Sequence, residues 1–493
     1  MGLEIDHGNF FSLRDYQLFI QRLDASLEVL EELFSRPGFG EGPLSYGAEL
    51  ELYLVDDEGC VAPVNEEVLE AADDPLLTLE LNRYNLEYNL KPYQMAERAF
   101  YRSQCDIEQA LQRLDEVAHN FGASVVPIGI LPTLRACDFA NDCITDKRRY
   151  HALVAQLCKR RGEQFQIDID GEEPLSFCMD SILLEGASTS FQAHYRVPPS
   201  QFVDTYNAIQ LATPLALALG ANSPCLLGHS LWAETRIPLF KQSIDMRVTD
   251  RYQWSEPARV HFGSGWMRSA VDAFRELVRL YEPILPVCSK HCPAQQLANG
   301  EMPELDEFRL HQSTVWLWNR PIYDPAAGGM LRIEMRALPA GPTAVDMLAN
   351  SAFLIGLAEG LKENINALLP ALPFRMAEYN FHRAAQHGLN ARIVWPQARQ
   401  LRCREQPVCA VIERALPLAA EGLAGIGVGR EDIDLYLGVI ENRLRAKQTG
   451  ASWQLAMLQK LYRSHSREVA QKKMLEIYMQ NSKSHRPVAE WAV

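Results

Sequence analysis

The sequence predicts an α+β fold built around an antiparallel sheet. Four strand-like runs place charged and apolar residues at alternate positions, so one side of each strand is charged and the other is apolar. Strands and helices alternate along the chain without the regular strand–helix–strand period of a parallel sheet. Helical periodicity dominates after about residue 343. These patterns indicate a sheet with flanking helices and a helical C-terminal part.

The length and composition are typical of a large globular protein. The chain has 493 residues, which is enough for two or three average domains or one large enzyme domain with insertions. Of these residues 47% are hydrophobic, which is ample for a core. Its formal net charge is −15, and its Lys/Arg clusters are limited to residues 147–149 and 159–161. Nucleic-acid binding requires a basic surface, so the composition argues against a nucleic-acid partner.

The sequence also predicts the compartment. The N-terminal residues 1–6 lack a basic segment followed by an apolar run, which argues against a secretory signal. The apolar stretches 211–221 and 348–361 are too short for a membrane span or carry a charge. Eleven scattered cysteines fit reduced thiols, so we expect a cytoplasmic protein without a membrane partner. A zinc site of irregular spacing is an alternative for some of them: Cys288, His291, Cys292, Cys403 and Cys409.

The first half of the chain mixes helices and strands. A helix is predicted over 14–34, ending at Pro37-Gly38, and a strand around Glu49 ends at the turn-like residues 56–59. Two further strands surround Glu80 and Glu87. The later elements are predicted, in order, as a helix over 97–121, a buried strand over 124–130, a helix over 146–161, a strand around His194, and a long apolar helix that Ser200 caps and that ends near residue 222.

The second half is mostly helical. Residues 224–303 are expected to be irregular apart from one helix over 267–281, and a strand follows over 331–336. The remaining helices are predicted over 343–369, 377–387, 408–423, 430–447 and 453–479. No low-complexity linker precedes this tail. We therefore treat the tail, residues 374–493, as a helical C-terminal subdomain packed on the main domain, residues 1–373, rather than as an independent unit.

The charged sides of the strands define one surface, named here the acid–arginine face. If the strands share a sheet, this face carries Glu49, Glu51, Glu80 or Glu87, His194, Arg332, Glu334 and Arg336. An ordinary solvated sheet would be richer in Thr, Ser and Lys. Magnesium is held by carboxylates together with substrate phosphate, and arginine forks bind phosphate and carboxylate oxygens. The face therefore suits divalent cations and a polyphosphate.

Each motif alone has a simpler explanation. A single Glu-x-Glu is more often just solvated, the run Arg332-x-Glu334-x-Arg336 alone is typical of an exposed ion-pair ladder, and His194 alone is more often structural. The shared parity of the four runs favours a site. Because such a face is expected to be exposed, Glu49→Ala or Glu334→Ala should change stability by no more than about 0.5 kcal/mol.

Several motifs in order resemble the glutamate–cysteine ligases and their carboxylate–amine ligase relatives. They are Gly47-Ala48-Glu49-Leu50-Glu51, the pair Glu80 and Glu87, Arg149-Tyr150, Gln192-Ala193-His194-Tyr195, Ala221-Asn222-Ser223-Pro224 and Glu334-Met335-Arg336, with Thr449 to Gln454 as a looser match in the tail. Each motif is short, whereas the ordered combination over roughly residues 45–345 is fairly specific.

The resemblance implies a glutamine synthetase-like fold, in which a curved antiparallel sheet lines a funnel that holds ATP and metal ions, Mg²⁺ or Mn²⁺. It also implies that the γ-carboxylate of glutamate attacks ATP and that the amine of cysteine displaces the resulting acyl phosphate. A carboxylate is a poor acyl donor until it is phosphorylated, so such a protein mainly positions anions and neutralises charge. The expected partners are small molecules, namely amino acids and ATP.

The resemblance also assigns roles to residues. The positions that match metal ligands are Glu49, Glu51, Glu80, Glu87, His194 and Glu334. Arg336 matches an arginine that contacts the ATP phosphates, and Arg332 on the same face is a second candidate for the cofactor. Arg149 and Arg236 are candidates for a substrate-binding arginine, so both join Arg336 as catalytic candidates.

Two segments depart from the family pattern. Residues 319–329 look like an insertion before the last motif strand, and residues 79–89 lack the glutamine-rich sequence that is common there. Such changes leave phosphorylation intact and alter the acceptor. The alternatives to glutamate–cysteine ligation are therefore a ligase with another amine acceptor, or a noncatalytic homologue that binds nucleotide or amino acid. Every matched acid is present, which favours catalysis.

Overall fold

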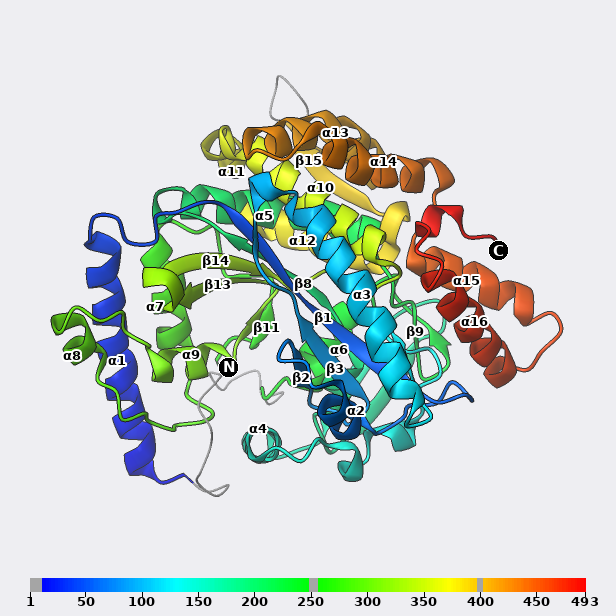
Figure 1. Ribbon diagram of the computed structural model, residues 1–493, viewed down its shortest axis with the longest axis horizontal. Helices are drawn as coiled ribbons and strands as arrows, with labels where there is room; N and C mark the ends of the chain where they lie inside the picture. Colours follow the sequence, from blue (N-terminus) through cyan, green and yellow to red (C-terminus); the bar gives the residue numbers. More distant parts are fainter. Residues whose placement is uncertain (1–10, 248–255, 397–401) are drawn as a thin grey trace.

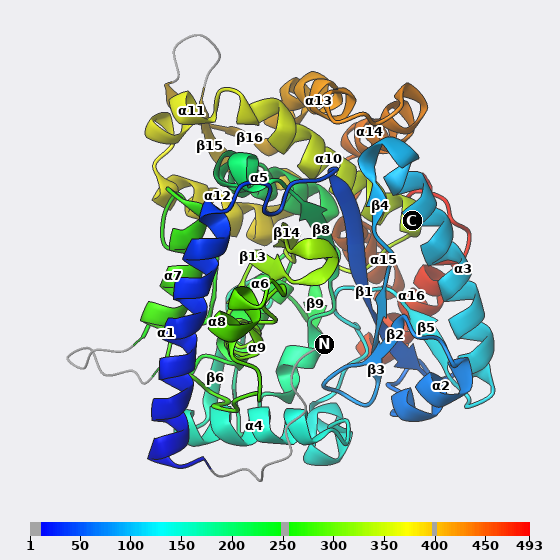
Figure 2. The same cartoon turned by 60° about the vertical axis from the view of Figure 1, so that its left-hand side comes forward.

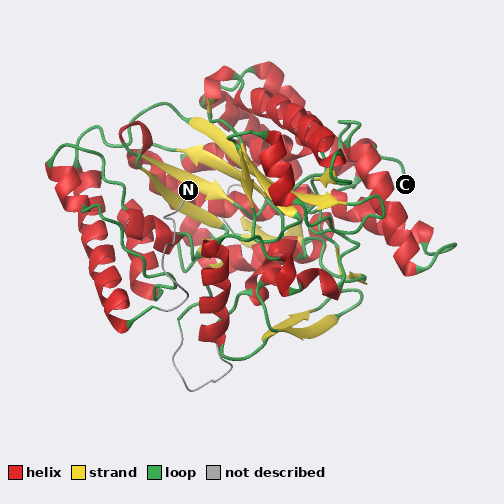
Figure 3. Cartoon of the chain, turned by 60° about the horizontal axis from the view of Figure 1, so that its bottom comes forward, coloured by secondary structure: helices red, strands yellow, loops and turns green. Residues whose placement is uncertain are grey.

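The computed structural model describes residues 11–247, 256–396 and 402–493. An antiparallel sheet crosses the middle of the molecule, with helices around it (Figures 1 and 3). Its strands lie in the order β13, β14, β8, β1, β3, β2, while β4 and β5 pair with opposite ends of β1. The bounds are β1 (Ser45–Val55), β2 (Leu77–Leu79), β3 (Asn85–Asn89), β4 (Tyr93–Gln94), β5 (Ser124–Val126), β8 (Phe191–Arg196), β13 (Asn319–Asp324) and β14 (Met330–Met335). The predicted α+β class with an antiparallel sheet is confirmed.

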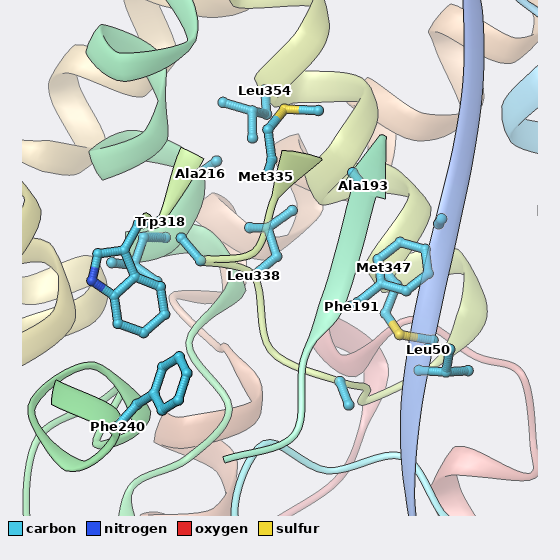
Figure 4. Close-up of a cluster of buried hydrophobic side chains, with 14 of the residues drawn as sticks. Leu50, Phe191, Ala193, Ala216, Phe240, Trp318, Met335, Leu338, Met347 and Leu354 are labelled. Atoms are coloured by element: carbon cyan, nitrogen blue, oxygen red, sulfur yellow. The ribbon is translucent and has the colours of Figure 1, made fainter. Parts of the chain in front are cut away.

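Two long helices cover the apolar face of this sheet. Helices α5 (Pro199–Gly220) and α10 (Ala344–Lys362) pack on each other, α10 also contacts β8, and α5 contacts β13 and β14. Figure 4 shows the buried cluster, in which Leu50, Phe191 and Met335 from the strands gather with Met347 and Leu354 from α10. Successive side chains of a strand point to opposite faces, so burying these apolar residues turns their charged neighbours to the other side.

Helix α10 passes a length and composition test for a membrane span. It is the one helix in the described part of the chain that does so, and 94% of its apolar window is buried inside the fold. The core helix of a globular protein passes the same test, and burial against the sheet accounts for the apolar composition of α10.

The other helices before α10 surround the sheet. α1 packs on α7, α8 and α9 to form a layer at one side (Figure 2). The bounds are α1 (Leu13–Ser35), α2 (Asn65–Ala72), α3 (Ala99–His119), α4 (Arg148–Arg161), α6 (Arg236–Ser243), α7 (Ala270–Leu280), α8 (Pro293–Ala298) and α9 (Asp306–Gln312). Three small strand pairs complete this part: β6 (Phe165–Ile169) with β7 (Leu175–Met179), β9 (Cys225–Leu226) with β10 (His229–Ser230), and β11 (Val260–His261) with β12 (Trp316–Leu317). A fourth pair, β15 (Arg392–Pro396) with β16 (Cys403–Pro407), lies in the C-terminal part.

The C-terminal part is helical, as predicted. It consists of α11 (Ile365–Ala371), α12 (Phe374–His387), α13 (Val408–Gly425), α14 (Arg430–Ala446), α15 (Gly450–Leu461) and α16 (Arg467–Ser482). Helices α13 and α14 pack on α10, and α12 packs on α5. The helical tail therefore lies directly on the core helices. A division at residue 373 stays a prediction.

Several element boundaries differ from the prediction. The helix predicted over 453–479 is two helices, α15 and α16, because a turn follows Leu461 and a new helix begins after Ser466, whose extended backbone occupies the N-cap position. The helix over 343–369 breaks likewise at Asn364, which precedes α11. Ser200 is not a cap, since α5 begins at Pro199, whose fixed φ suits the first helical position. The strand β5 ends at Val126, because the following proline has no N–H for the ladder.

Candidate active site

The register of the sheet gathers the predicted residues on one face. Glu49 lies opposite Gln192, Glu51 lies opposite Glu87, and His194 lies opposite Glu334. Residues directly opposite in an antiparallel pair point to the same side of the sheet. The acid–arginine face is therefore a real surface of the fold, on the side away from the apolar cluster.

Glu49, His194 and Glu334 form a compact group of possible metal ligands. One ligand atom from each lies within 4.8 Å of the others, and the described residues contain no second such group of three or more. His194 Nε2 lies 3.1 Å from Glu49 Oε1, but this contact does not have hydrogen-bond geometry. The other ring nitrogen, Nδ1, is also buried without a hydrogen-bond partner. Buried polar atoms are normally satisfied, so this unpartnered nitrogen fits a metal ligand. Burial acts to raise the pKa of Glu49, but His194 and Arg332 outweigh it and hold that pKa below its ordinary value.

Two arginines hold Glu334 from either side. Arg320 Nη2 lies 2.8 Å from Glu334 Oε2, and Arg336 Nε lies 2.8 Å from Oε1. Burial acts to raise the pKa of Glu334, but the two guanidinium groups and His194 keep that pKa below its ordinary value. Arg336 also donates from Nη2 to Gln192 Oε1 at 2.7 Å. Glu334 is thus ionised, fixed in position and shared between neighbours.

The burial of Glu334 changes the expected effect of its removal. Its side chain is 2% exposed, whereas that of Glu49 is 23% exposed. The prediction that Glu334→Ala leaves stability almost unchanged is therefore wrong in its premise, because this part of the face is not solvated. Removing the carboxylate would leave Arg320 and Arg336 largely buried without their partner, which is costly.

A second group of acids faces Glu49 from strand β3 and its surroundings. Burial and the charges of Glu87, Glu51 and Glu185 raise the pKa of Glu80 well above its ordinary value. Burial, with Glu49 and Glu51, raises the pKa of Glu87 to about 8, and burial, with Glu51, raises that of Glu185 to about 7. These carboxyl groups are crowded together without enough positive charge, which is the electrostatic situation that a divalent cation relieves.

Hydrogen bonds fix the orientation of Glu51 in this group. The Ser190 backbone N–H donates to Glu51 Oε2 at 2.6 Å, and Gln192 Nε2 donates to Oε1 at 2.8 Å. Burial still raises the pKa of Glu51, against the opposing charges of Arg336 and Arg236. Gln192 therefore bridges Glu51 to Arg336 and connects the two groups of acids.

The remaining predicted arginines lie at different depths. Arg332 is on the face and lies 3.6 Å from Asp324. Arg149, at the start of α4, donates to Ser313 Oγ at 3.0 Å. Arg236 is buried, pairs with Glu234 at 3.2 Å, and donates to the backbone carbonyls of Arg336 and Ala337 at 3.2 and 3.1 Å. Arg236 therefore supports the end of β14, while substrate roles for Arg149 and Arg236 stay predictions.

A comparison with protein families agrees with this geometry. Residues 45–476 match the family model described as glutamate-cysteine ligase family 2, GCS2. The chain belongs to this family. The match includes both the sheet and most of the helical tail of this GCS2-family chain, and family membership supports an enzyme of the carboxylate–amine ligase class.

Solved structures resemble the GCS2-family chain at low sequence identity. The glutamate–cysteine ligase from Francisella tularensis, in complex with AMP, is 12% identical, has a TM-score of 0.52, and is matched over 90% of each chain. The bifunctional glutathione synthetase from Pasteurella multocida is 12% identical with a TM-score of 0.47, over 94% of this chain and 55% of that one. No curated protein sequence matches. The first structure shows that the fold is shared.

Three further residues adjoin the acid–arginine face and were not among the predicted site residues: Gln192, Arg320 and Glu185. Gln192 has the same parity as His194, so the strand pattern contained its signal. Arg320 lies in the segment 319–329 that was interpreted as an insertion. The first six residues of this segment form the edge strand β13, which pairs with β14. Glu185 lies in a short 3₁₀ turn over Leu183–Ala187, where no periodic sequence pattern predicts a site residue.

The zinc alternative gains no support in this GCS2-family chain. Cys403 Sγ donates to the Ala371 carbonyl at 2.9 Å, and Cys409 Sγ donates to the Leu389 carbonyl at 3.2 Å. Within residues 11–247, 256–396 and 402–493, none of the five predicted zinc ligands belongs to a cluster of potential metal ligands. The cysteines behave as separate thiols in the described structure.

Proposed function

We propose that this GCS2-family chain is an ATP-dependent ligase that joins the γ-carboxylate of glutamate to the amine of cysteine through an acyl phosphate. The observation that carries the proposal is the acid–arginine face, where a histidine–carboxylate group and a second group of acids adjoin arginines. The description of the family and the AMP bound to the Francisella tularensis relative support the choice of substrates and nucleotide.

The residues present fit Mg²⁺ or Mn²⁺. The proposed ligands are Glu49, His194 and Glu334 in one group, and Glu51, Glu80 and Glu87 in the other. The unpartnered nitrogen of His194 and the raised pKa values of the second group favour these roles. Such ions supply positive charge to the phosphate oxygens and to the phosphoryl group in transfer.

The side chains of the chain position the reacting groups. Arg336 and Arg332 bind the phosphates of ATP, with Arg336 held at a fixed angle by Glu334 and Gln192. An oxygen of the glutamate γ-carboxylate attacks the γ-phosphorus, and ADP leaves. The amine nitrogen of cysteine then attacks the acyl carbon, inorganic phosphate leaves, and the amine loses a proton as the amide forms. No protein nucleophile is required.

Positional isotope exchange tests the first step. ATP labelled at the β,γ-bridging oxygen is incubated with the protein, Mg²⁺ and glutamate without an acceptor. Reversible phosphorylation of glutamate lets the β-phosphate of bound ADP rotate before the step reverses, so we expect scrambling of the label. Omitting glutamate is the control. No acyl phosphate can then form, so we expect no scrambling of the label.

Addition of amines tests the acceptor. Cysteine should accelerate net phosphate release and yield a product with the mass of γ-glutamylcysteine. Exchange with glutamate but release accelerated only by another amine would keep the ligase and overturn the cysteine assignment. A folded protein that binds metal–ATP but shows neither exchange nor release with any amino acid would overturn catalysis and favour a sensor.

A further inference from the structure

Arg320 of the edge strand β13 lies outside the motifs that carry the family resemblance, yet its side chain contacts the acid–arginine face. It lies opposite Glu334 in the register of β13 and β14, so both side chains point to the same side of the sheet. Arg320 Nη2 donates to Glu334 Oε2 at 2.8 Å. The side chain of Arg320 is only 13% exposed. This contact is therefore a largely buried ion pair rather than a solvated one at the surface.

A second hydrogen bond anchors the guanidinium group of Arg320. Its Nη1 atom donates to the Gln312 carbonyl at 3.3 Å, and Gln312 in turn donates from Nε2 to the Pro321 carbonyl. Gln312 is buried at the end of α9, a helix that packs on α1 and α7. The helices at the side of the sheet thus fix the position from which Arg320 reaches Glu334.

Two arginines are more than the charge of Glu334 requires. Arg336 Nε donates to the other carboxylate oxygen, Oε1, at 2.8 Å, and a single guanidinium group already balances a single carboxylate charge. The terminal torsion of a glutamate side chain has a broad preference, so one contact leaves the carboxylate plane free to turn. Contacts to both oxygens, one from β13 and one from the end of β14, fix that plane.

The fixed carboxylate of Glu334 still has capacity for a cation. An ionised carboxylate has about four lone-pair sites, and the contacts of Arg320 and Arg336 use one on each oxygen. A Glu334 oxygen also lies within 4.8 Å of the ligand atoms of Glu49 and His194. Carboxylates that bind metal are themselves hydrogen-bonded by outer partners, which set their orientation. Arg320 has the geometry of such a partner.

We infer that Arg320 is a positioning residue of the ligase site. It fixes the plane of the Glu334 carboxylate for the metal group that Glu334 forms with Glu49 and His194, and through the same carboxylate it steadies Arg336. Arg320 itself contacts neither the metal nor ATP. This inference rests on the proposed function, because that proposal makes Glu334 a metal ligand and Arg336 a phosphate ligand.

Binding of Mn²⁺ to the full chain tests this inference without nucleotide or glutamate. The electron paramagnetic resonance signal of free Mn²⁺ measures binding, and Glu334→Gln shows which bound ion depends on this carboxylate. Arg320→Lys keeps the charge, but an ammonium group cannot hold Glu334 and the Gln312 carbonyl in one planar fork. We expect Arg320→Lys to weaken binding of the same ion at least about tenfold, and to lower turnover at saturating ATP by a similar factor.

Arg98→Lys is the matched control. Arg98 Nη2 lies 2.6 Å from Oδ1 of the buried Asp432, so this arginine also holds a buried acid, but outside the face. Arg98→Lys should leave Mn²⁺ binding and turnover unchanged, and thermal unfolding checks that both lysine variants are folded. Full Mn²⁺ affinity in Arg320→Lys would show that the charge suffices and would overturn the inference alone. Unchanged Mn²⁺ binding in Glu334→Gln would instead overturn the proposed metal role of Glu334, and the inference with it.

Discussion

The acid–arginine face and the junction between α10 and α14 both bury arginine against carboxylate, but their charge balance differs. At the junction Arg443 donates to Asp346 at 2.7 Å, and both side chains are almost completely buried. The second oxygen of Asp346 accepts from the Thr343 hydroxyl at 2.7 Å and from the Val488 backbone N–H at 2.9 Å. One acid and one base neutralise each other there, and both carboxylate oxygens are satisfied.

The face has more carboxylates than arginines. Glu334 is neutralised by its two arginines, but the pKa values of Glu80, Glu87 and Glu185 are all raised by burial and by neighbouring acids. A fold gains nothing from such crowding unless something positive joins it. A balanced buried pair therefore indicates a structural role, whereas an excess of buried acid indicates cation binding.

Asn222 connects the helical tail to the acid–arginine face. Gln454 of α15 donates to Asn222 Oδ1 at 2.8 Å, and the Asn222 backbone N–H donates to Glu234 at 2.9 Å. Glu234 pairs with Arg236, which holds the carbonyl of Arg336. Two motifs far apart in the sequence, 221–224 and 449–454, therefore meet, and the helical tail supports the strand that carries Arg336.

The largest expected effect is at the junction. Asp346→Ala leaves Arg443 buried without its partner, so the free energy of unfolding should fall by about 3–5 kcal/mol. Denaturant unfolding followed by circular dichroism measures this change. Asp346→Leu combined with Arg443→Met removes both charges and should recover part of the loss, because the buried Val488 backbone N–H still lacks its acceptor. Equal destabilisation by the double variant would contradict the view that charge balance is what matters here.

Glu334→Gln tests the opposite region. We expect turnover to fall about 100- to 1,000-fold, because the substitution removes a charge that fixes Arg336 and that is proposed to hold a metal. Stability should fall as well, since two arginines lose an ionised partner. Phosphate release measures turnover, and Glu363→Gln, an exposed acid at the end of α10, is the matched control. Full activity of the Glu334 variant would remove this residue from the site.

The sequence predicts the face better than the details around it. Strand periodicity is strong, so the shared parity of Glu49, His194 and Glu334 is visible in the order of residues alone. Gln192 belongs to the same pattern, whereas Glu185 depends on a 3₁₀ turn brought close by tertiary packing. The burial of Glu334 is not predictable in this way, because the covering residue Arg320 comes from a strand that resembles an insertion.

Arg336→Lys tests whether the guanidinium fork or the charge alone is needed within the face. Lysine keeps the charge but cannot donate to Glu334 and Gln192 in the same planar fork. We expect the rate at saturating ATP to fall about 100-fold, with metal binding retained. Steady-state kinetics over ATP concentration separates rate from affinity, and Arg375→Lys on α12, outside the face, is the control. A near-normal rate would show that charge alone suffices.

The excess of acid also predicts a pH dependence. The pKa values of Glu87, about 8, and Glu185, about 7, lie above the ordinary 4.5, so the folded protein retains protons that the unfolded chain releases. Without metal, the free energy of unfolding should therefore decrease as pH rises from about 5 to about 8. Thermal unfolding with and without Mg²⁺ measures this, and Mg²⁺ should stabilise most at the upper end. A flat profile in the absence of metal would contradict the crowding.

The smallest expected effect belongs to an exposed ion pair that joins the helical tail to the connection between β6 and β7. Arg467, at the start of α16, pairs with Glu173, and their side chains are 47% and 36% exposed. Its hydrogen bond lowers the pKa of Glu173 to about 2, so any contribution is present above pH 4.5 and is lost as pH falls toward 2. Solvent and salt screen such a pair, so Arg467→Ala should cost no more than about 1 kcal/mol at neutral pH and leave turnover unchanged. Denaturant unfolding at low and high salt measures it. A loss as large as that of Asp346→Ala would mean that burial does not distinguish the two pairs that connect the tail to the rest of the molecule.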